Sequence, residues 1–238
     1  MRPLQFLAVT AVLMVTLTSC NEGGKHLFIL SGQSNMAGLD PDESFTPAVV
    51  AAFGEGNVIV VKDAAGGQPI RRWYKNWKPA EGDGPEATGD LYDRLMAKVD
   101  SATAHTHIRS LTFVWMQGER DAREAHGQVY GGSLRGLLDQ LRGDLGREDI
   151  NAVIGRLSDF DMDNARYPHW TMIREAEVAF ADENPWGAWV DTDDLNDGKN
   201  RQGNDIENDL HMSGKGYRIL GERFALESIA LIKNNGIR

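Results

Sequence analysis

Two residues that could together carry out acyl transfer stand far apart in the chain, a serine near its beginning and a histidine near its end. Ser34 follows the apolar run LFIL in the segment LFILSGQSNMAG (27–38), and His211 stands in NDLHMSGKGYRILGERFA (208–225). A serine hydroxyl is a weak nucleophile until a base takes its proton, and histidine is the side chain that most often acts as that base. If the fold brings Ser34 and His211 together, they can hydrolyse an ester through a covalent acyl intermediate.

Acyl transfer also needs hydrogen-bond donors around the oxygen that becomes negatively charged. The segment AAGG (64–67) leaves the backbone unobstructed at Gly66 and Gly67, and the backbone amide of Ser34 is a second donor. The side-chain amide of Gln117, which follows another apolar run, is a third candidate. The two glycines fit an ordinary turn equally well.

The elements that must position these residues alternate between short apolar runs and amphipathic stretches. Helix-like segments span about 89–102, 128–145, 170–182 and 214–234. The apolar runs, each of strand length, are LFIL (27–30), VIVV (58–61), LTFVWM (111–116), AVIGRL (152–157) and AWV (188–190). Alternating strands and helices predict an α/β fold with one five-stranded parallel sheet and helices on both faces.

In such a sheet, ligands bind outside the carboxyl ends of the strands, where the strand order reverses. Ser34, the glycine pair, Gln117 and the acidic loops after the fourth and fifth runs all follow strand ends, so we expect them at one edge. His211 stands just before the last helix, at the same edge. The other five histidines are His26, His105 and His107, expected at the opposite end of the sheet, and His126 and His169, expected on loops.

Length and charge limit the class of protein. The chain has 238 residues, 41% of them hydrophobic, which is enough for one sizeable core, so we expect a single domain over residues 20–238. Its formal net charge is −10 and its lysines and arginines form no run, so nucleic acid is not an expected partner.

Carboxylates crowd the expected edge of the sheet, at Asp159, Asp161, Asp191, Asp193 and Asp194, so a loosely bound cation is one possible occupant. The spacing does not fit a calcium loop of the EF-hand type, because Trp170 falls where a bidentate Glu is required.

The N-terminal sequence is typical of an export signal. An apolar stretch after Arg2 is shorter than the ~20 residues that cross a bilayer, and it ends in LTSC, which resembles a bacterial lipobox. We therefore expect residues 1–19 to be a signal peptide, Cys20 to carry the lipid, and the mature protein to be exported and anchored to a membrane. A plain secretory signal is the alternative. Cys20 is the only cysteine, so the mature fold holds no disulfide.

Four segments resemble, in order, the conserved blocks of the SGNH hydrolases, in particular the sialate O-acetylesterase-like carbohydrate esterases. They are GQSNMAG, AAGGQPIRRW, WMQGERDA and DLHMSGKGYRILGERFA. The resemblance implies a flavodoxin-like three-layer α/β/α fold, no cofactor, Ser34 as nucleophile and His211 as base. It implies Ser34, Gly67 and Gln117 as oxyanion donors. Glu119 and Asp121, in the QGERD segment, would brace the loop by accepting backbone hydrogen bonds.

The residue that orients His211 departs from the common pattern. Most SGNH enzymes place an Asp three residues before the His, and that position here is Asn208. Asp209, two residues before, matches the D-x-H form of the sialate-esterase branch and is the residue we favour. Asn208 as a neutral orienter, a Ser–His dyad, and Asp193 or Asp194 as substitutes stay open.

The substrate expected from this resemblance is an acetylated sugar or glycan, from which the enzyme would remove O-acetyl groups. Arg71, Arg72 and Trp73 are candidate substrate-binding residues, since aromatic rings stack on sugars and arginines donate to hydroxyls or carboxylates. The alternative function is a non-catalytic carbohydrate-binding lipoprotein in which Trp73, Trp77 and Trp170 form the sugar surface. Equally, these aromatic rings could seal the loops over the core. An α/β-hydrolase is excluded, because Met36 replaces the second glycine of G-x-S-x-G.

Overall fold

The computed structural model describes residues 23–235, and the expected signal peptide and Cys20 lie outside them. Five parallel strands form one sheet in the order β2-β1-β3-β4-β5. Their bounds are β1 (Lys25–Gly32), β2 (Val58–Ala64), β3 (Ile108–Met116), β4 (Ile150–Gly155) and β5 (Gly187–Val190). Four strands contain one of the apolar runs each, and β4 contains the first four residues of the run at 152–157, so the predicted five-stranded parallel sheet is confirmed.

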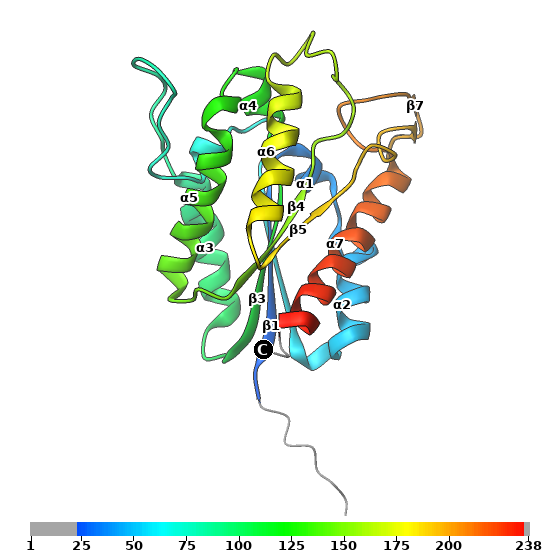
Figure 1. Cartoon of the computed structure of the whole chain (residues 1–238). Helices are drawn as coiled ribbons and strands as arrows, with labels where there is room; N and C mark the ends of the chain where they lie inside the picture. Colours follow the sequence, from blue (N-terminus) through cyan, green and yellow to red (C-terminus); the bar gives the residue numbers. More distant parts are fainter. Residues whose placement is uncertain (1–22, 236–238) are drawn as a thin grey trace, which may run out of the picture.

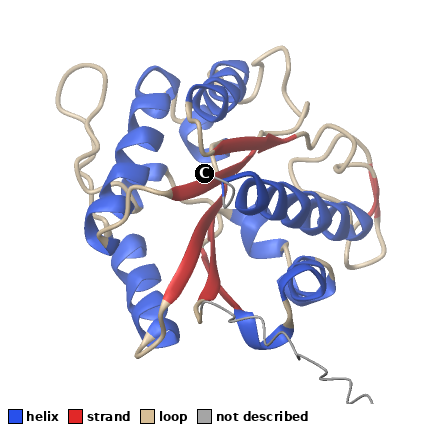
Figure 2. Cartoon of the chain, turned by 60° about the horizontal axis from the view of Figure 1, so that its bottom comes forward, coloured by secondary structure: helices blue, strands red, loops and turns tan. Residues whose placement is uncertain are grey.

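Helices cover both faces of the sheet, as Figures 1 and 2 show. One face carries α2 (Phe45–Phe53) and α7 (Gly214–Asn235), which pack on each other. The other face carries α3 (Asp90–Thr103), α5 (Gly127–Leu145) and α6 (Trp170–Glu183). The result is the three-layer α/β/α arrangement expected from the alternating pattern.

Short elements join these layers. Two short helices, α1 (Ser34–Gly38) and α4 (Glu119–Arg123), lie at the same end of the sheet, at the top of Figure 1. Three 3-10 turns, η1 (Pro41–Glu43), η2 (Glu55–Asn57) and η3 (Ile70–Arg72), lie in the loops. A small antiparallel hairpin, β6 (Gly198–Lys199) with β7 (Asp205–Ile206), precedes α7. The sequence pattern predicted neither α2 nor this hairpin.

The core forms because the middle strands are apolar on both faces. Leu27, Phe28, Ile29 and Leu30 of β1 are almost completely buried, as expected for a parallel strand covered by helices on both sides. Leu27 lies opposite Ile59 of β2 and Leu111 of β3, so the apolar runs meet in register.

The strand order reverses between β1 and β3, since the chain places β2 on one side of β1 and then β3 on the other. The two strand ends approach closely there. The N–H of Gln33 donates to the carbonyl oxygen of Met116 over 2.9 Å. Gly32 has a φ of 145°, and a Cβ at Gly32 would lie 1.9 Å from that oxygen. Only glycine fits this position, and it brings the residues after β1 beside those after β3.

No helix within residues 23–235 is both long enough and apolar enough to cross a bilayer.

Candidate active site

Ser34 is the first residue of α1, separated from the end of β1 by Gln33, and it is partly exposed. The glycine turn after β2 lies beside it, since a Cβ built on Gly66 would be 3.8 Å from the Cβ of Ser34. Gly67 completes the turn with a φ of 67°, a left-handed conformation that favours glycine. Within residues 23–235, the backbone N–H groups of Ser34 and Gly67 have no hydrogen-bond acceptor. Both are therefore free to donate to an oxyanion.

Asn35, the residue after Ser34, connects the serine turn to the histidine loop. Its Nδ2 donates to the carbonyl oxygen of Leu210 over 3.1 Å, and the N–H of Met212 donates to its Oδ1 over 3.3 Å. Leu210 and Met212 are the two chain neighbours of His211. The structure thus brings the beginning of α1 and the loop before α7 together, with Ser34 and His211 each next to a bonded residue.

The remaining bonding capacity of Asn35 is also used. Nδ2 donates to Oε1 of Glu119 over 2.8 Å, and the hydroxyl of Tyr217 donates to Oδ1 over 3.1 Å. The Asn35 side chain is 3% exposed, so these four bonds satisfy a buried amide completely. Such a residue fixes the relative position of three chain segments.

Among the candidate orienting groups, Asp209 lies nearest to His211. Its Oδ1 is 3.8 Å from Nδ1 of the histidine, and it also accepts the backbone N–H of His211 over 2.8 Å. Both side chains are about half exposed. The distance to Nδ1 is longer than a hydrogen bond, and catalytic contacts of this kind often tighten when substrate binds.

The side chain of Asn208 is bonded to residues other than His211, and its backbone φ is 41°. Its Nδ2 donates to the carbonyl oxygen of Phe160 over 3.3 Å, and its Oδ1 accepts from Asn196 over 3.1 Å. The amide thus holds the loop after β4.

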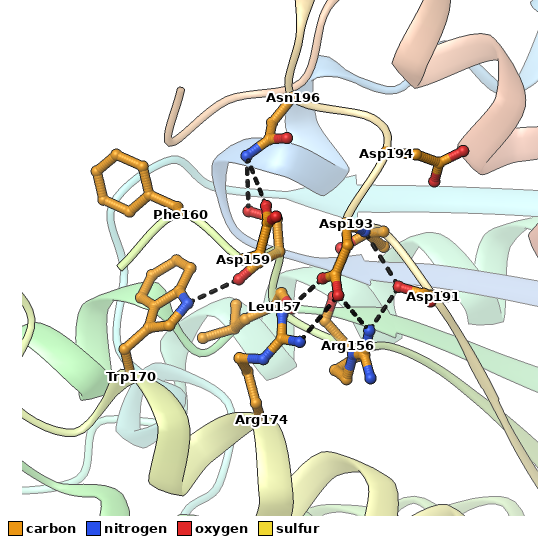
Figure 3. A network of polar contacts seen from close by, with 12 residues as sticks. Arg156, Leu157, Asp159, Phe160, Trp170, Arg174, Asp191, Asp193, Asp194 and Asn196 are labelled. Atoms are coloured by element: carbon orange, nitrogen blue, oxygen red, sulfur yellow. Dashed lines mark hydrogen bonds and ion pairs between the residues drawn. The ribbon is translucent and has the colours of Figure 1, made fainter. Parts of the chain in front are cut away.

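Asp193 and Asp194 are engaged by arginines at the acidic edge. Figure 3 shows Asp193 between Arg156 and Arg174, with ion-pair distances of 2.8 Å and 2.7 Å. Asp194 pairs with Arg223 over 2.6 Å. These arginines neutralise Asp193 and Asp194, two of the five carboxylates at which the sequence suggested a cation. Residues 23–235 hold no group of three or more potential metal ligands.

Gln117 is fully buried at the end of β3. Its Nε2 has three acceptors, which are Oδ2 of Asp121 at 2.6 Å, the carbonyl oxygen of Gln68 at 3.1 Å and Oε1 of Gln33 at 3.2 Å. An amide nitrogen carries two hydrogens, so none is left over. In this arrangement Gln117 holds the loops around Ser34 together, and it would have to release an acceptor to serve as an oxyanion donor.

Two fully buried carboxyl groups, those of Glu119 and Asp121, support the segments around Ser34. Oδ2 of Asp121 accepts the backbone N–H of Ile70 over 2.8 Å, and Glu119 accepts the Asn35 amide. Burial raises the pKa of Glu119 to about 7 and that of Asp121 to about 6. Each braces a loop, Asp121 through a backbone amide and Glu119 through a side chain.

The predicted sugar-stacking surface is wrong. Trp73 is 0% exposed and packs edge-on against Trp115 with ring centroids 5.2 Å apart. Trp77 and Trp170 are also buried, and Nε1 of Trp170 donates to the carbonyl oxygen of Ser158 over 2.7 Å. These rings seal the loops over the core, because large aromatic surfaces gain most from leaving water.

Arg71 and Arg72 are paired with carboxylates. Nη1 of Arg71 lies 2.6 Å from Oε2 of Glu124, and the guanidinium lies 5.8 Å from the ring centre of Trp77. Nε of Arg72 donates to Asp90 over 2.6 Å. Both arginines hold the loop after β2 in place, so a substrate would have to compete with these partners.

Sequence reasoning missed Asn35 and Gln33. Both stand in GQSNM beside Ser34, but the sequence does not show that they face inward. Oε1 of Gln33 accepts from the backbone of Arg120 over 3.1 Å as well as from Gln117. The only sequence feature that could have indicated their roles is that both are polar and flank a serine at a strand end.

Comparison with known proteins gives a family match. The family described as "Carbohydrate esterase, sialic acid-specific acetylesterase" matches residues 37–230. The matched range includes Gly67, Gln117 and His211 and begins three residues after Ser34. No curated protein matches the chain.

Similar folds occur among solved structures. A protein of Arabidopsis thaliana is 18% identical with a TM-score of 0.66, and the alignment covers 87% of this chain and 98% of that one. A carbohydrate acetylesterase from Xanthomonas citri is 16% identical with a TM-score of 0.62, over 89% of this chain and 57% of that one. NanS is 16% identical with a TM-score of 0.61, over 91% and 99%. At these identities the likeness shows a shared fold.

Proposed function

The chain belongs to the sialic acid-specific acetylesterase family of carbohydrate esterases, and from this membership we propose that Ser34 and His211 hydrolyse the acetyl esters of sugars. Membership makes the protein a carbohydrate O-acetylesterase, as the four sequence blocks predicted. The observation that carries the proposal is the pair of hydrogen bonds between Asn35 and the two neighbours of His211.

In the proposed mechanism, His211 takes the proton of the Ser34 hydroxyl while the oxygen attacks the acetyl carbonyl carbon. The sugar oxygen leaves with the proton that His211 returns, and the acetyl group stays on Ser34. Water, deprotonated by His211, then releases acetate and restores the serine. The free N–H groups of Ser34 and Gly67 stabilise the negative oxygen in both steps.

Asp209 completes the proposed triad. Its carboxylate favours the charged imidazolium and holds the ring in the tautomer that leaves Nε2 free to accept a proton. The backbone bond from His211 to Asp209 fixes the carboxylate next to the ring before substrate arrives.

We also propose that the enzyme works outside the cytosol. The support is the sequence before Asn21: an apolar segment ending in LTSC, as expected for a signal peptide over residues 1–19 and a lipid anchor on Cys20.

Removal of the nucleophile tests the catalytic assignment. Ser34→Ala should lower the turnover of para-nitrophenyl acetate by ~10³-fold or more, because only oxyanion stabilisation and binding remain. Its circular dichroism spectrum should match the wild type. Ser101→Ala, at an exposed position of α3, is the matched control and should keep full activity. Near-normal turnover by Ser34→Ala would make Ser34 a turn residue.

A further inference from the structure

A pocket of about 410 Å³ opens beside His211. Its walls come from the end of α1, the beginning of α7 and the loop of the β6–β7 hairpin. Its lining includes Asp209 and His211, together with Asn200, Arg201 and Gln202 of the hairpin loop. A group held there lies next to the proposed base.

The pocket offers no uncompensated positive charge. Of the described residues that line it, Arg201 alone is permanently cationic. Its guanidinium forms two bonds to the Glu43 carboxylate, at 2.8 Å and 3.0 Å, and lies 5.5 Å from the ring centre of Tyr217. Asp209 also lines the pocket, so a substrate carboxylate would have to displace Glu43 and would meet a second negative charge.

Neutral hydrogen-bonding groups line the same pocket. Oδ1 of Asn200 accepts the backbone N–H groups of Gln202 and Asn204, each over 3.0 Å, which fixes the loop. The Gln202 side chain is exposed, and no described residue accepts from or donates to its amide. Tyr217 contributes a neutral wall, since burial raises the pKa of its hydroxyl to about 12. Amides with unused donors and acceptors suit sugar hydroxyls.

We propose that this pocket holds the ring of an uncharged O-acetylated sugar, and that the enzyme deacetylates neutral sugars in preference to sialic acids. The inference rests on the proposed function, because it takes His211 as the base. It narrows the substrate within a family whose description is sialic acid-specific.

The first test compares two substrates. We expect kcat/KM for acetylated xylose to exceed that for O-acetylated N-acetylneuraminic acid by roughly tenfold or more, as one unfavourable charge contact would produce. An equal or lower value for the neutral ester overturns the proposal. Hydrolysis of para-nitrophenyl acetate, which carries no sugar, is measured in parallel. Failure there contradicts the serine esterase itself, whereas failure of the substrate preference alone contradicts only the inference about the pocket.

The second test adds a charge to the pocket. Gln202→Lys introduces an unpaired cation into the pocket, so the preference for the neutral substrate, measured as the ratio of the two kcat/KM values, should shrink several-fold as the sialate gains affinity. Gln128→Lys makes the same change at an exposed position of α5 and should leave the preference at its wild-type value. An unchanged preference in Gln202→Lys, or an equal shift in Gln128→Lys, would show that the pocket does not receive the sugar.

Discussion

At the scale of single residues, the geometry around His211 separates two candidates for its orienting partner. Asp209 has an oxygen 3.8 Å from Nδ1, whereas the Asn208 amide is bonded to Asn196 and Phe160. A carboxylate both fixes the imidazole tautomer and stabilises the imidazolium, and an amide can do only the first.

We therefore predict that Asp209→Asn lowers esterase turnover by ~10²-fold or more, part of the loss that a wrong tautomer causes. Asn208→Ala should keep its turnover per folded molecule and lose only thermal stability, because its bonds hold a loop. Steady-state kinetics on para-nitrophenyl acetate, with melting curves for both variants, measures this. Collapse of Asn208→Ala with a near-normal Asp209→Asn would identify the amide as the orienting group.

The site residues that the sequence could suggest are those whose side chains can act as a nucleophile or a base. Ser34 and His211 stood out because few side chains can serve as nucleophile and base. Asn35 did not, since its role depends on Leu210 and Met212, far away in the chain. Trp73 was misjudged because an aromatic residue in a polar loop looks exposed in sequence, and only packing against Trp115 reveals its burial.

At the scale of elements, the turn from β3 into α4 carries buried carboxyl groups. Glu119 and Asp121 are fully buried, and one oxygen of each has no hydrogen-bond partner among the described residues. Burial raises the pKa of Glu119 from 4.5 to about 7, so folding favours its protonated form. The contribution to stability is complete below about pH 4.5 and is lost as the pH rises through 7.

Glu119→Gln should remove this contribution, because the amide is uncharged at every pH and its oxygen can still accept from Asn35. We predict that the melting temperature of the variant falls less than that of the wild type between pH 4.5 and 7, and is higher at pH 8. Asp121, with a pKa of about 6, leaves a smaller residual dependence. Glu175→Gln, exposed on α6, is the control. Parallel pH curves for Glu119→Gln and wild type would contradict the burial argument.

Elements with strong apolar patterns were predicted from sequence, and those that depend on tertiary contacts were not. All five strands overlap apolar runs, and burial is most continuous in β1 and β4, which lie inside the sheet with helices on both faces. Helix α2 has Pro47 near its beginning and is stabilised by packing on α7, which no local pattern reveals. The strands β6 and β7 have two residues each, too few for any periodicity.

At the scale of the whole molecule, the expected signal peptide over residues 1–19 and the expected lipid on Cys20 lead to a prediction about where the protein is found in the cell. We predict that Cys20→Ser moves the protein from the membrane fraction to the soluble fraction of the cells that make it, because the lipid has lost its attachment site. Fractionation and immunoblotting measure the shift, and the activity of the released enzyme should be unchanged. If the wild type is soluble too, the segment is a plain secretory signal.

The bonds made by Asn35 join residues that are 175, 177 and 182 positions apart. Contacts of such separation form late in folding, since the long intervening chain must be ordered first. In the proposed mechanism, a chain emerging from the ribosome exposes Ser34 before His211 has been synthesised, so we expect incomplete or partly folded molecules to lack esterase activity. During refolding from denaturant, esterase activity should return more slowly than the helical signal in circular dichroism. Activity would then report on the docking of the last helix, α7, and so on the completion of the fold.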